Sequence, residues 1–430
     1  MRLAGRTAAA IEIITEIFGR HRPASEALKD WGKAHRFAGS TDRHAIGTLV
    51  YDCMRRRNSL GHRMADDSPR ALVLAALHDV WGLAARDILA MAGELHGPGP
   101  LTSDEQKRLD SVIVGERPLA VAADVPEWLA PAFTQSFGAR AAEEGTAMAQ
   151  RAPIDLRANA LKVSRAEVLE ALKKFGAVEG PLSPWAVRVA ASGPEARNAN
   201  VEAEPAHGLG LFEVQDAASQ VAALMSGAKP GETVADICAG AGGKTLALAA
   251  MMHNQGQLVA TDSDRHRLRP IFERIARSGA SNIEVIAADE GEKLRPRSFN
   301  CVVVDAPCSG SGAWRRKPDA KWRLSERLLA QRVKDQCHVL EKGFELVKPG
   351  GRLLYITCSV LARENSAQVA AFLARHGDCR IVPYAEQWRA CVGGEAPASA
   401  DGAPDTLLLT PARHGTDGFF MAVMRKASSE

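Results

Sequence analysis

The 430-residue sequence lacks the marks of several protein classes. It has no run of about 18 uncharged apolar residues, so we expect no membrane span. Its eight cysteines show neither Cys-x-x-Cys nor paired Cys/His spacing, which argues against a zinc site and a disulfide framework. The net charge is only +3, and 46% hydrophobic with 24% charged residues is ordinary for a globular protein. We therefore expect a cytoplasmic protein with reduced thiols and no metal.

The positive charge is unevenly distributed along the chain. Residues 1–70 hold 13 Lys and Arg against 8 Asp and Glu, and residues 315–342 hold 9 against 4. Local basic patches are typical of proteins with a polyanionic partner, although one patch alone is more often a solvated helix face. The charge pattern therefore favours nucleic-acid binding only in combination with other signals.

The first half of the chain divides into two parts. Residues 1–95 carry Ala, Leu and Ile at helical spacing, which predicts a small helical bundle. Its first segment is predicted to be an amphipathic helix rather than a signal peptide, because Glu12 and Glu16 interrupt the apolar stretch. After a Gly/Pro-rich break, residues 104–205 begin with linking helices and continue as a short β-α-β pattern of the kind found in RNA-binding, RRM-like units.

Residues 206–430 alternate strand and helix patterns. The predicted strands are residues 232–238, 257–261, 283–287, 299–304 and 352–357. Two last apolar runs, 406–410 and 418–424, are expected to pair as a hairpin at the sheet edge. This alternation predicts the α/β fold class with a doubly wound, Rossmann-like sheet, in which ligands gather beyond the carboxyl ends of the strands.

Two cysteines follow predicted strands directly. Cys308 ends the run V-V-V-D-A-P-C, and Cys358 ends L-L-Y-I-T-C. A free cysteine is most often a small buried hydrophobic residue, and this is the expectation for Cys53, Cys301, Cys337 and Cys379. Cys308 and Cys358 differ because a strand end in a Pro/Ser/Gly setting places both thiols where one substrate can meet them.

A glycine-rich stretch, D-I-C-A-G-A-G-G-K-T at residues 236–245, follows the first strand of this part. It matches neither a Walker loop nor a dinucleotide fingerprint, and alone it can be an ordinary tight turn. Asp262, Asp289 and Asp305 follow the next three strands, where a carboxylate can accept ribose hydroxyls, although any one of them is more often a cap. Together the loop and the acids predict a nucleoside cofactor without phosphates to hold.

These motifs together resemble the RNA 5-methylcytosine methyltransferases of the RsmB/NOP2/NSUN family. The resemblance rests on the glycine-rich stretch, D-A-P-C-S-G-S-G, R-R-K-P-D-A-K-W, Y-I-T-C-S-V-L-A-R-E-N and the terminal D-G-F-F. It continues upstream through F-E-V-Q-D, I-D-L-R-A-N and P-E-W-L and covers most of residues 125–430. The first 95 residues resemble the NusB-like helical RNA-binding domain of the bacterial RsmB branch.

The resemblance implies S-adenosylmethionine as cofactor and cytosine in RNA as substrate. The cofactor loop that it implies consists of Cys238, Ala239, Gly240, Ala241, Gly242, Gly243 and Lys244. Asp262 would hold the ribose, Asp289 would lie by the adenine, and Asp305 would sit between cofactor and base. Cys358 matches the family's nucleophile, and Cys308 matches a second cysteine linked to product release.

One departure from the family lies in the cofactor loop. The family commonly has Ala-Pro before Gly-Gly-Lys, whereas this chain has Gly240 and Ala241 there. A rigid residue is lost and a flexible one gained, so we expect the change to act on cofactor affinity rather than on cofactor identity.

Two thiols suit methylation at C5 of cytosine. C5 is a poor nucleophile, but a thiolate that adds to C6 turns the ring into an enamine that can take a methyl group from a sulfonium. The C5 proton must then leave and the Cys–C6 bond must break, which requires a nearby base. Asp305 can hydrogen-bond the cytosine edge or, when protonated, support N3. Because DNA cytosine methyltransferases use the cysteine of a Pro-Cys pair, Cys308 is the alternative nucleophile, although the T-C-S motif favours Cys358.

The expected function is methylation of cytosine C5 in RNA, with small-subunit (16S) rRNA favoured by the RsmB-like helical part. The alternatives are tRNA, large-subunit rRNA, or a non-catalytic RNA-binding or assembly factor. We expect a monomer with no membrane or metal partner. The residues expected to bind RNA phosphate are Arg315, Arg316, Lys317 and Lys321.

Overall fold

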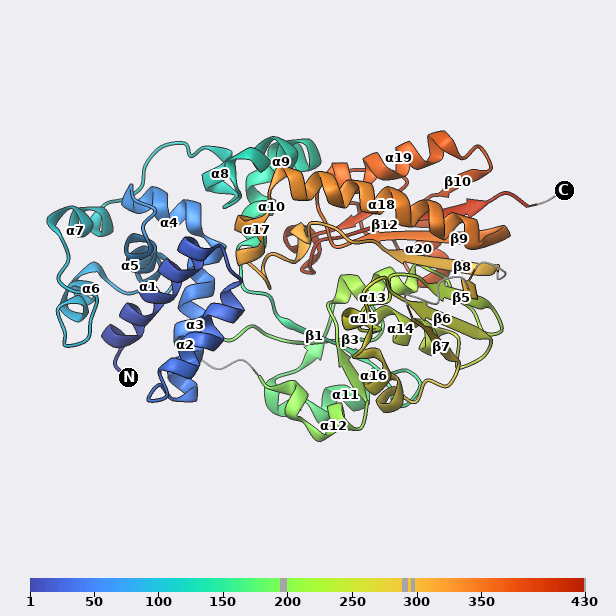
Figure 1. Ribbon diagram of the computed structural model, residues 1–430, viewed down its shortest axis with the longest axis horizontal. Helices are drawn as coiled ribbons and strands as arrows, with labels where there is room; N and C mark the ends of the chain where they lie inside the picture. Colours follow the sequence, from blue (N-terminus) through green and yellow to red (C-terminus); the bar gives the residue numbers. More distant parts are fainter. Residues whose placement is uncertain (194–198, 288–292, 295–297, 429–430) are drawn as a thin grey trace.

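The computed structural model describes residues 1–193, 199–287, 293–294 and 298–428. A helical part, a small antiparallel sheet and a large sheet with helices on both faces lie next to one another (Figure 1). The mixed α/β fold that the alternating pattern predicts is confirmed. Among the described residues, no helix is long and apolar enough to cross a bilayer.

The helical part is a bundle around one buried helix. Its members are α1 (Leu3–Arg20), α2 (Ala24–Ala34), α3 (Ser40–Arg55), α4 (Arg57–Met64), α5 (Pro69–Asp79), α6 (Ala85–Ala92) and α7 (Ser103–Asp110). Helix α5 begins at Pro69 because Ser68 caps it, accepting a hydrogen bond from the backbone N–H of Ala71. Residues 71–77 are all buried, so α5 is apolar on every side and the other helices surround it.

A short helical connection leads to the small sheet. It consists of α8 (Leu119–Ala122), α9 (Ala130–Phe137) and α10 (Ala141–Met148), with single 3-10 turns at Glu127–Leu129 and Gly138–Arg140. Several of its apolar side chains, including those of Phe133 and Phe137, belong to the core of the large sheet rather than to the helical bundle. The connection therefore packs onto the large sheet before the chain enters the small one.

The small sheet has the strand order β2-β3-β1-β4, with antiparallel neighbours. Its strands are β1 (Ile154–Ala158), β2 (Val178–Glu179), β3 (Ala186–Val189) and β4 (Phe212–Val214). Between β1 and β2 lies helix α11 (Arg165–Ala171), which Ser164 caps. The short helix α12 (Pro205–Gly208) precedes β4. The predicted β-α-β pattern is confirmed as β1, α11 and β3, whereas β2 and β4 were not predicted because they are only two and three residues long.

The large sheet has the strand order β10-β12-β9-β8-β5-β6-β7, with β11 on β12. The strands are β5 (Thr233–Asp236), β6 (Gln257–Thr261), β7 (Ile283–Ile286), β8 (Phe299–Asp305), β9 (Val347–Thr357), β10 (Cys379–Val382), β11 (Leu407–Leu409) and β12 (Phe419–Lys426). Strands β5 to β9 are parallel, and all five were predicted. The chain adds β6 and β7 on one side of β5 and then returns to add β8 and β9 on the other side. The switch point of the sheet therefore lies at the carboxyl ends of β5 and β8.

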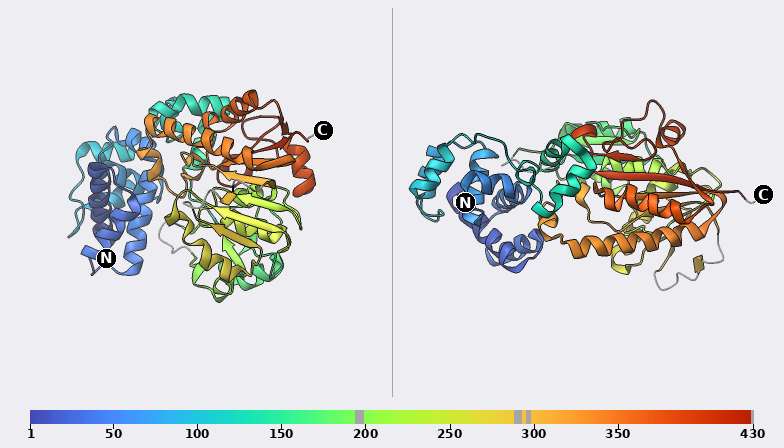
Figure 2. Two further views of the ribbon diagram at one scale, coloured as in Figure 1. Left: turned by 45° about the vertical axis from the view of Figure 1, so that its right-hand side comes forward. Right: turned by 90° about the horizontal axis from the view of Figure 1, so that it is seen from above.

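Helices cover both faces of the large sheet (Figures 1 and 2). The helices in this part of the chain are α13 (Ala217–Leu224), α14 (Gly243–Met251), α15 (Arg265–Leu268), α16 (Ile271–Ser278), α17 (Asp319–Arg323), α18 (Glu326–Leu346), α19 (Ser366–Arg375), α20 (Tyr384–Cys391) and α21 (Pro411–His414). Strand β8 shows why both faces are covered: Val302 and Val304 pack with α18 and α19, whereas Cys301 and Val303 pack with α13 and α14. Such continuous apolar strands are typical of a parallel sheet buried on both sides.

The predicted hairpin exists and lies at the sheet edge, but it shares that edge with a strand that was not predicted. Strand β11 pairs antiparallel with β12, as expected. However, β12 lies between β9 and β10, because the unpredicted strand β10 pairs with its C-terminal half. Strand β10 has the sequence C-R-I-V, in which an arginine breaks the apolar run, so the pattern gave little sign of a strand.

Candidate active site

The two predicted cysteines lie side by side. Cys308 follows β8 and Cys358 follows β9, and these neighbouring parallel strands place Asp305 opposite Ile356. The Sγ atoms of the cysteines are 3.4 Å apart. The hydrogen bond to Cys358 and burial raise the pKa of the Cys308 thiol well above its usual value. Cys308 is therefore held as a thiol, with Cys358 as its hydrogen-bond partner.

A close backbone approach fixes the loop after Cys308. The N–H of Gly312 donates to the carbonyl oxygen of Cys358 at 2.9 Å, and the N–H of Gly418 donates to the carbonyl oxygen of Gly312 at 2.8 Å. A Cβ atom at Gly312 would lie 2.1 Å from the carbonyl oxygen of Gly418. Glycine is thus required here, which links the S-G-S-G and D-G-F-F motifs to the geometry of the thiols.

Lys244 and Asp305 form an ion pair beside the thiols. The Nζ atom of Lys244, on the first turn of α14, lies 2.7 Å from Oδ2 of Asp305 at the end of β8. Burial would lower the pKa of Lys244, but the charge of Asp305, its hydrogen bond and the nearby Cys358 outweigh this effect and raise it. Asp305 therefore holds Lys244 as a charged ammonium near Cys358. The sequence predicted it only as part of the cofactor loop.

The loop from Cys238 to Lys244 joins β5 to α14, as predicted. Gly240 and Gly242 have φ angles of 52° and 84°, in the left-handed region that favours glycine. Gly240, where the family commonly has alanine, thus suits the backbone conformation of this loop. Its N–H donates to Oδ2 of the buried Asp262 at 2.9 Å. Asp262 therefore shapes the loop from the end of β6.

A cleft of about 770 Å³ lies beside this loop, a volume within the range of small-molecule sites, about 300 to 1,000 Å³. Its lining includes Ile237, Cys238, Asp262, Asp264, Arg267, Pro307, Arg332, Asp335, His338 and Val339. Carboxylates for ribose hydroxyls and apolar walls for a base are both present, so the residues fit a nucleoside cofactor. The sequence pattern did not indicate that residues of α18 line this cleft, because a helix face with mixed polar residues carries no sequence signal for binding. Asp289 lies outside the described residues.

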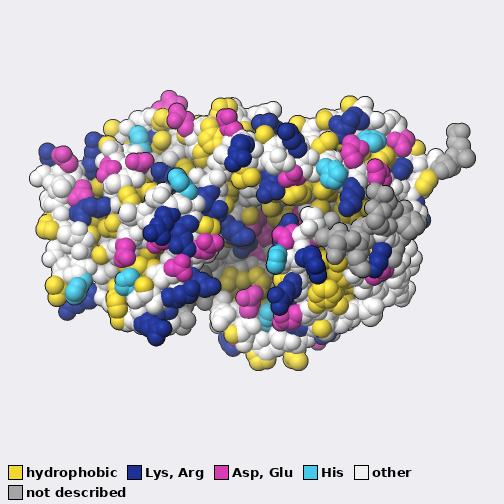
Figure 3. Space-filling model, in the orientation of Figure 1, with side chains coloured by type: hydrophobic (Ala, Val, Ile, Leu, Met, Phe, Trp, Pro, Cys, Tyr) yellow, Lys and Arg dark blue, Asp and Glu magenta, His cyan; other side chains and the backbone are white. Residues whose placement is uncertain are grey.

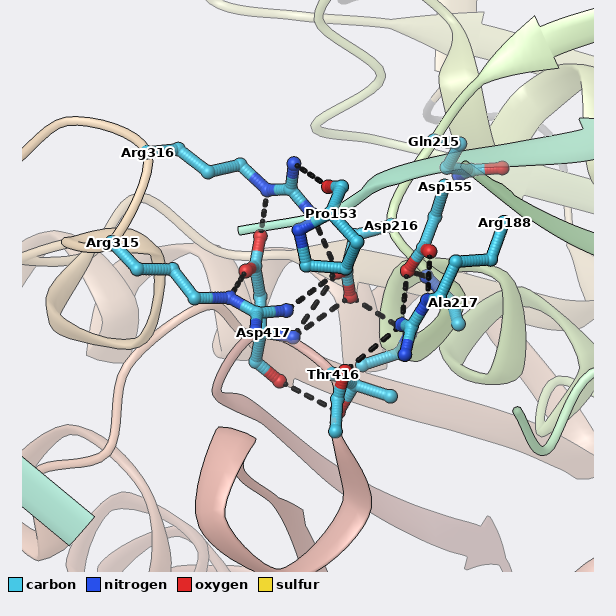
Figure 4. Close-up of polar contacts among 12 residues, drawn as sticks. Pro153, Asp155, Arg188, Gln215, Asp216, Ala217, Arg315, Arg316, Thr416 and Asp417 are labelled. Carbon is cyan, nitrogen blue, oxygen red and sulfur yellow. Dashed lines mark hydrogen bonds and ion pairs between the residues drawn. The ribbon is translucent and has the colours of Figure 1, made fainter. Parts of the chain in front are cut away.

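Arg315 and Arg316 do not extend freely towards solvent (Figure 4). Both guanidinium groups donate to the buried carboxylate of Asp417, and Arg316 also donates to Asp216 at 2.9 Å. Arg316 further donates to the carbonyl oxygen of Pro153 at 3.0 Å. The cluster thus joins the D-G-F-F and F-E-V-Q-D motifs to the start of the small sheet. It positions these parts relative to the large sheet.

Lys321 was expected to bind RNA phosphate, but its position in the structure is against this. Its side chain is buried, and Nζ donates to the carbonyl oxygens of Arg55 and Asp124 at 2.7 and 2.5 Å. Burial lowers its pKa to about 8. Lys321 therefore ties α17 to the helical bundle and cannot reach a phosphate from this position. Lys317 is exposed, and its contact with RNA stays a prediction.

A second cleft, of about 420 Å³, lies between the helical part and the two sheets. The arginines that line it are Arg43, Arg55, Arg151, Arg315 and Arg316. Lys and Arg side chains gather around the hollow between the helical part and the α/β part (Figure 3). We call this second cleft the arginine cleft. Among the described residues, no cluster of His, Cys, Asp and Glu could hold a metal ion.

Comparison with known proteins agrees with this geometry. The family model "16S rRNA methyltransferase RsmB/F" matches residues 223–425, and that of the RsmF/B-like ferredoxin-like domain matches residues 125–194. The ribosomal RNA small subunit methyltransferase B of Shewanella oneidensis is 32% identical over 308 residues, which are 71% of this chain and 68% of that protein. This chain belongs to the RsmB/F family. The resemblance inferred from the motifs is confirmed, and the chain is an RNA methyltransferase.

Two further comparisons support the assignment to the RsmB/F family. The Klebsiella pneumoniae (strain 342) ribosomal RNA small subunit methyltransferase B is 36% identical over 265 residues, 60% of this chain and 59% of that protein. The crystal structure of PH0851 superposes with a TM-score of 0.73 at 25% identity and covers 99% of this chain and 100% of its own. The similarity in structure therefore extends over the helical N-terminal part as well as the RsmB/F methyltransferase sheet.

Proposed function

We propose that this RsmB/F family member methylates C5 of a cytosine in 16S rRNA through a covalent bond between Cys358 and C6. The observation that carries the proposal is the pair of thiols 3.4 Å apart, next to the Lys244–Asp305 ion pair at the carboxyl ends of neighbouring strands. A methyltransferase acting on an oxygen or an exocyclic nitrogen has no evident use for two adjacent thiols, whereas methylation at C5 needs one group that adds to and leaves C6 and another that takes the proton from the adjacent C5.

The cofactor proposed for the 770 Å³ cleft is S-adenosylmethionine, held by the loop from Cys238 to Lys244 with Asp262 at the ribose. When bound, it supplies an electrophilic methyl group. The chain's own residues do the rest. Cys358 adds to C6 of the base as its thiolate, next to the charged Lys244, and Asp305 hydrogen-bonds the base edge.

Cys308 takes part after the methyl group has been transferred. Its raised pKa keeps it as a thiol while Cys358 attacks. We propose that Cys308 then passes its proton to the leaving sulfur of Cys358 and takes up the C5 proton, so that the Cys358–C6 bond breaks, both thiols are restored and the RNA leaves. In this division of labour, Cys358 is the nucleophile and Cys308 acts in release.

RNA is proposed to lie along the arginine cleft, between the helical part and the methyltransferase sheet. This proposal includes three domains: a NusB-like domain at residues 1–95, a linking and RNA-binding unit at 104–205, and the methyltransferase domain at 206–430. Phosphate contacts supply most of the affinity in such interfaces and make it depend on salt. A monomer acting in the cytoplasm is the simplest form of this proposal.

The proposal is tested by finding where the methyl group is placed. Small ribosomal subunits, isolated 16S rRNA, 23S rRNA and total tRNA, each lacking the modification, are incubated with the protein and labelled S-adenosylmethionine. Digested nucleosides are then analysed by mass spectrometry. We expect 5-methylcytosine in 16S rRNA, alone or in the subunit, and none with Cys358→Ala. Label on another atom or base, or on tRNA or 23S rRNA instead, would contradict the proposal.

A further inference from the structure

One buried carboxyl group connects the two loops that carry the cysteines. Glu364 is fully buried in the 3-10 turn Ala362–Glu364, after β9. Its Oε1 atom accepts hydrogen bonds from the N–H of Ser309 at 2.8 Å and from Nε2 of Gln336 at 2.9 Å. Its Oε2 atom accepts from the hydroxyl groups of Ser309 and Ser359, each at 2.5 Å.

The two serines are the residues that directly follow the cysteines. Ser309 comes after Cys308, and Ser359 comes after Cys358. Because a single carboxyl group binds both, it fixes one loop relative to the other at the point where the thiols meet. Gln336, on α18, extends the connection by donating to the carbonyl oxygen of Pro307 at 3.0 Å, on the other side of Cys308.

The chemistry of this position requires glutamate rather than an amide. Four donors converge on Glu364, and only a carboxylate offers acceptors alone on both of its oxygens. Burying a carboxylate is costly unless its hydrogen bonds are made, and here they are all made by neutral donors. The negative charge also contributes, after the hydrogen bond to Cys358 and burial, to raising the pKa of Cys308.

We propose that Glu364 is a positioning residue for methyl transfer, which sets the distance and orientation of Cys308 and Cys358 by holding Ser309 and Ser359. The inference rests on the proposed function, because it assigns the attack on C6 to one thiol and release to the other. Each serine serves one of the two steps: Ser359 aligns the nucleophile, and Ser309 aligns the group that acts in release.

The test compares Glu364→Gln with Glu144→Gln. Glu144 is also fully buried and accepts a hydrogen bond from a hydroxyl group, that of Thr410, but it lies on α10. Misplacing a catalytic group by about 1 Å can cost about a hundredfold in rate. We therefore expect kcat for Glu364→Gln to fall by about a hundredfold at unchanged KM for RNA and cofactor. Glu144→Gln should keep both constants, with both variants assayed well below the temperatures at which they unfold.

The single serine variants separate the two steps. On a denaturing gel, Ser359→Ala should form the protein–RNA adduct more slowly than the wild type. Ser309→Ala should form it at the normal rate but release it slowly, so that the adduct accumulates. Equal kcat in Glu364→Gln and Glu144→Gln, with normal adduct kinetics in both serine variants, would overturn the inference and leave the proposed function intact. A wild type that forms neither 5-methylcytosine nor adduct would overturn both.

Discussion

Two adjacent glycines of the cofactor loop should respond very differently to the same substitution. Gly242 precedes α14 with a φ of 84°, and a Cβ atom there would lie 2.4 Å from Cγ1 of the buried Ile271. Gly243 is the first residue of α14, and the nearest atom to its Cβ, Nε2 of Gln215, is 3.5 Å away. Gly242→Ala therefore creates strain and overlap, whereas Gly243→Ala creates neither.

The size of the effect follows from these two terms. The left-handed conformation costs alanine about 1 to 2 kcal/mol, and a methyl group forced into a packed core costs about 1 to 3 kcal/mol. The free energy of unfolding should thus fall by about 2 to 5 kcal/mol in Gly242→Ala. In Gly243→Ala it should change by at most about 1 kcal/mol, because alanine favours a helix.

Urea unfolding of both variants measures the stability, and calorimetric titration with S-adenosylmethionine measures the affinity. Because relieving the overlap moves the loop, Gly242→Ala should bind the cofactor about tenfold more weakly, a change of about 1.4 kcal/mol. Gly243→Ala should bind it as the wild type does. Equal stability and equal affinity in the two variants would refute the description of this loop.

Three further predictions concern buried charges. Burial raises the pKa of Asp236 to about 7, so the folded protein keeps a proton that the unfolded chain loses near pH 4. The free energy of unfolding should therefore fall as the pH rises from about 4 to about 7. In urea unfolding across this range Asp236→Asn should lack this fall, and a pH profile identical to that of the wild type would contradict the prediction. Asp417→Asn removes one of the two carboxylates that Arg315 and Arg316 bind, leaving only Asp216, and should lower the free energy of unfolding by about 3 kcal/mol, against at most about 1 kcal/mol for Glu341→Gln at a more exposed ion pair. Lys244→Met should slow methyl transfer by about a hundredfold, since a charge fixed near the reacting groups is lost; a labelled-methyl assay showing a rate within threefold of the wild type would refute this role.

The sequence was sufficient to place the thiols but not the groups around them. Two apolar runs that each end in a cysteine predict neighbouring strand ends, and the parallel pairing of β8 with β9 indeed brings Cys308 to Cys358. Glu364 lies within a motif that the sequence pointed out, yet nothing in the pattern shows that its carboxyl group turns back to both serines. Such a contact depends on how the turn after β9 folds.

The basic residues were harder to interpret for a related reason. A run such as R-R-K-P-D-A-K-W looks like a surface for phosphate, but its two lysines and two arginines differ in burial. Lys321 is covered because α17 packs against the helical bundle, more than 260 residues away in the chain. Arg315 is neutralised by Asp417, about 100 residues away. Long-range packing of this kind leaves no local periodicity, so composition alone could not separate these side chains from the exposed Lys317.

The division of labour between the two cysteines can be tested by trapping the covalent adduct. Wild type, Cys308→Ala and Cys358→Ala are mixed with 16S rRNA and S-adenosylmethionine, and the protein–RNA adduct is measured on a denaturing gel. We predict that the adduct accumulates in Cys308→Ala, where release fails, and is absent in Cys358→Ala, where no nucleophile remains. An adduct that persists in Cys358→Ala and disappears in Cys308→Ala would show that Cys308 is the nucleophile and would contradict the account.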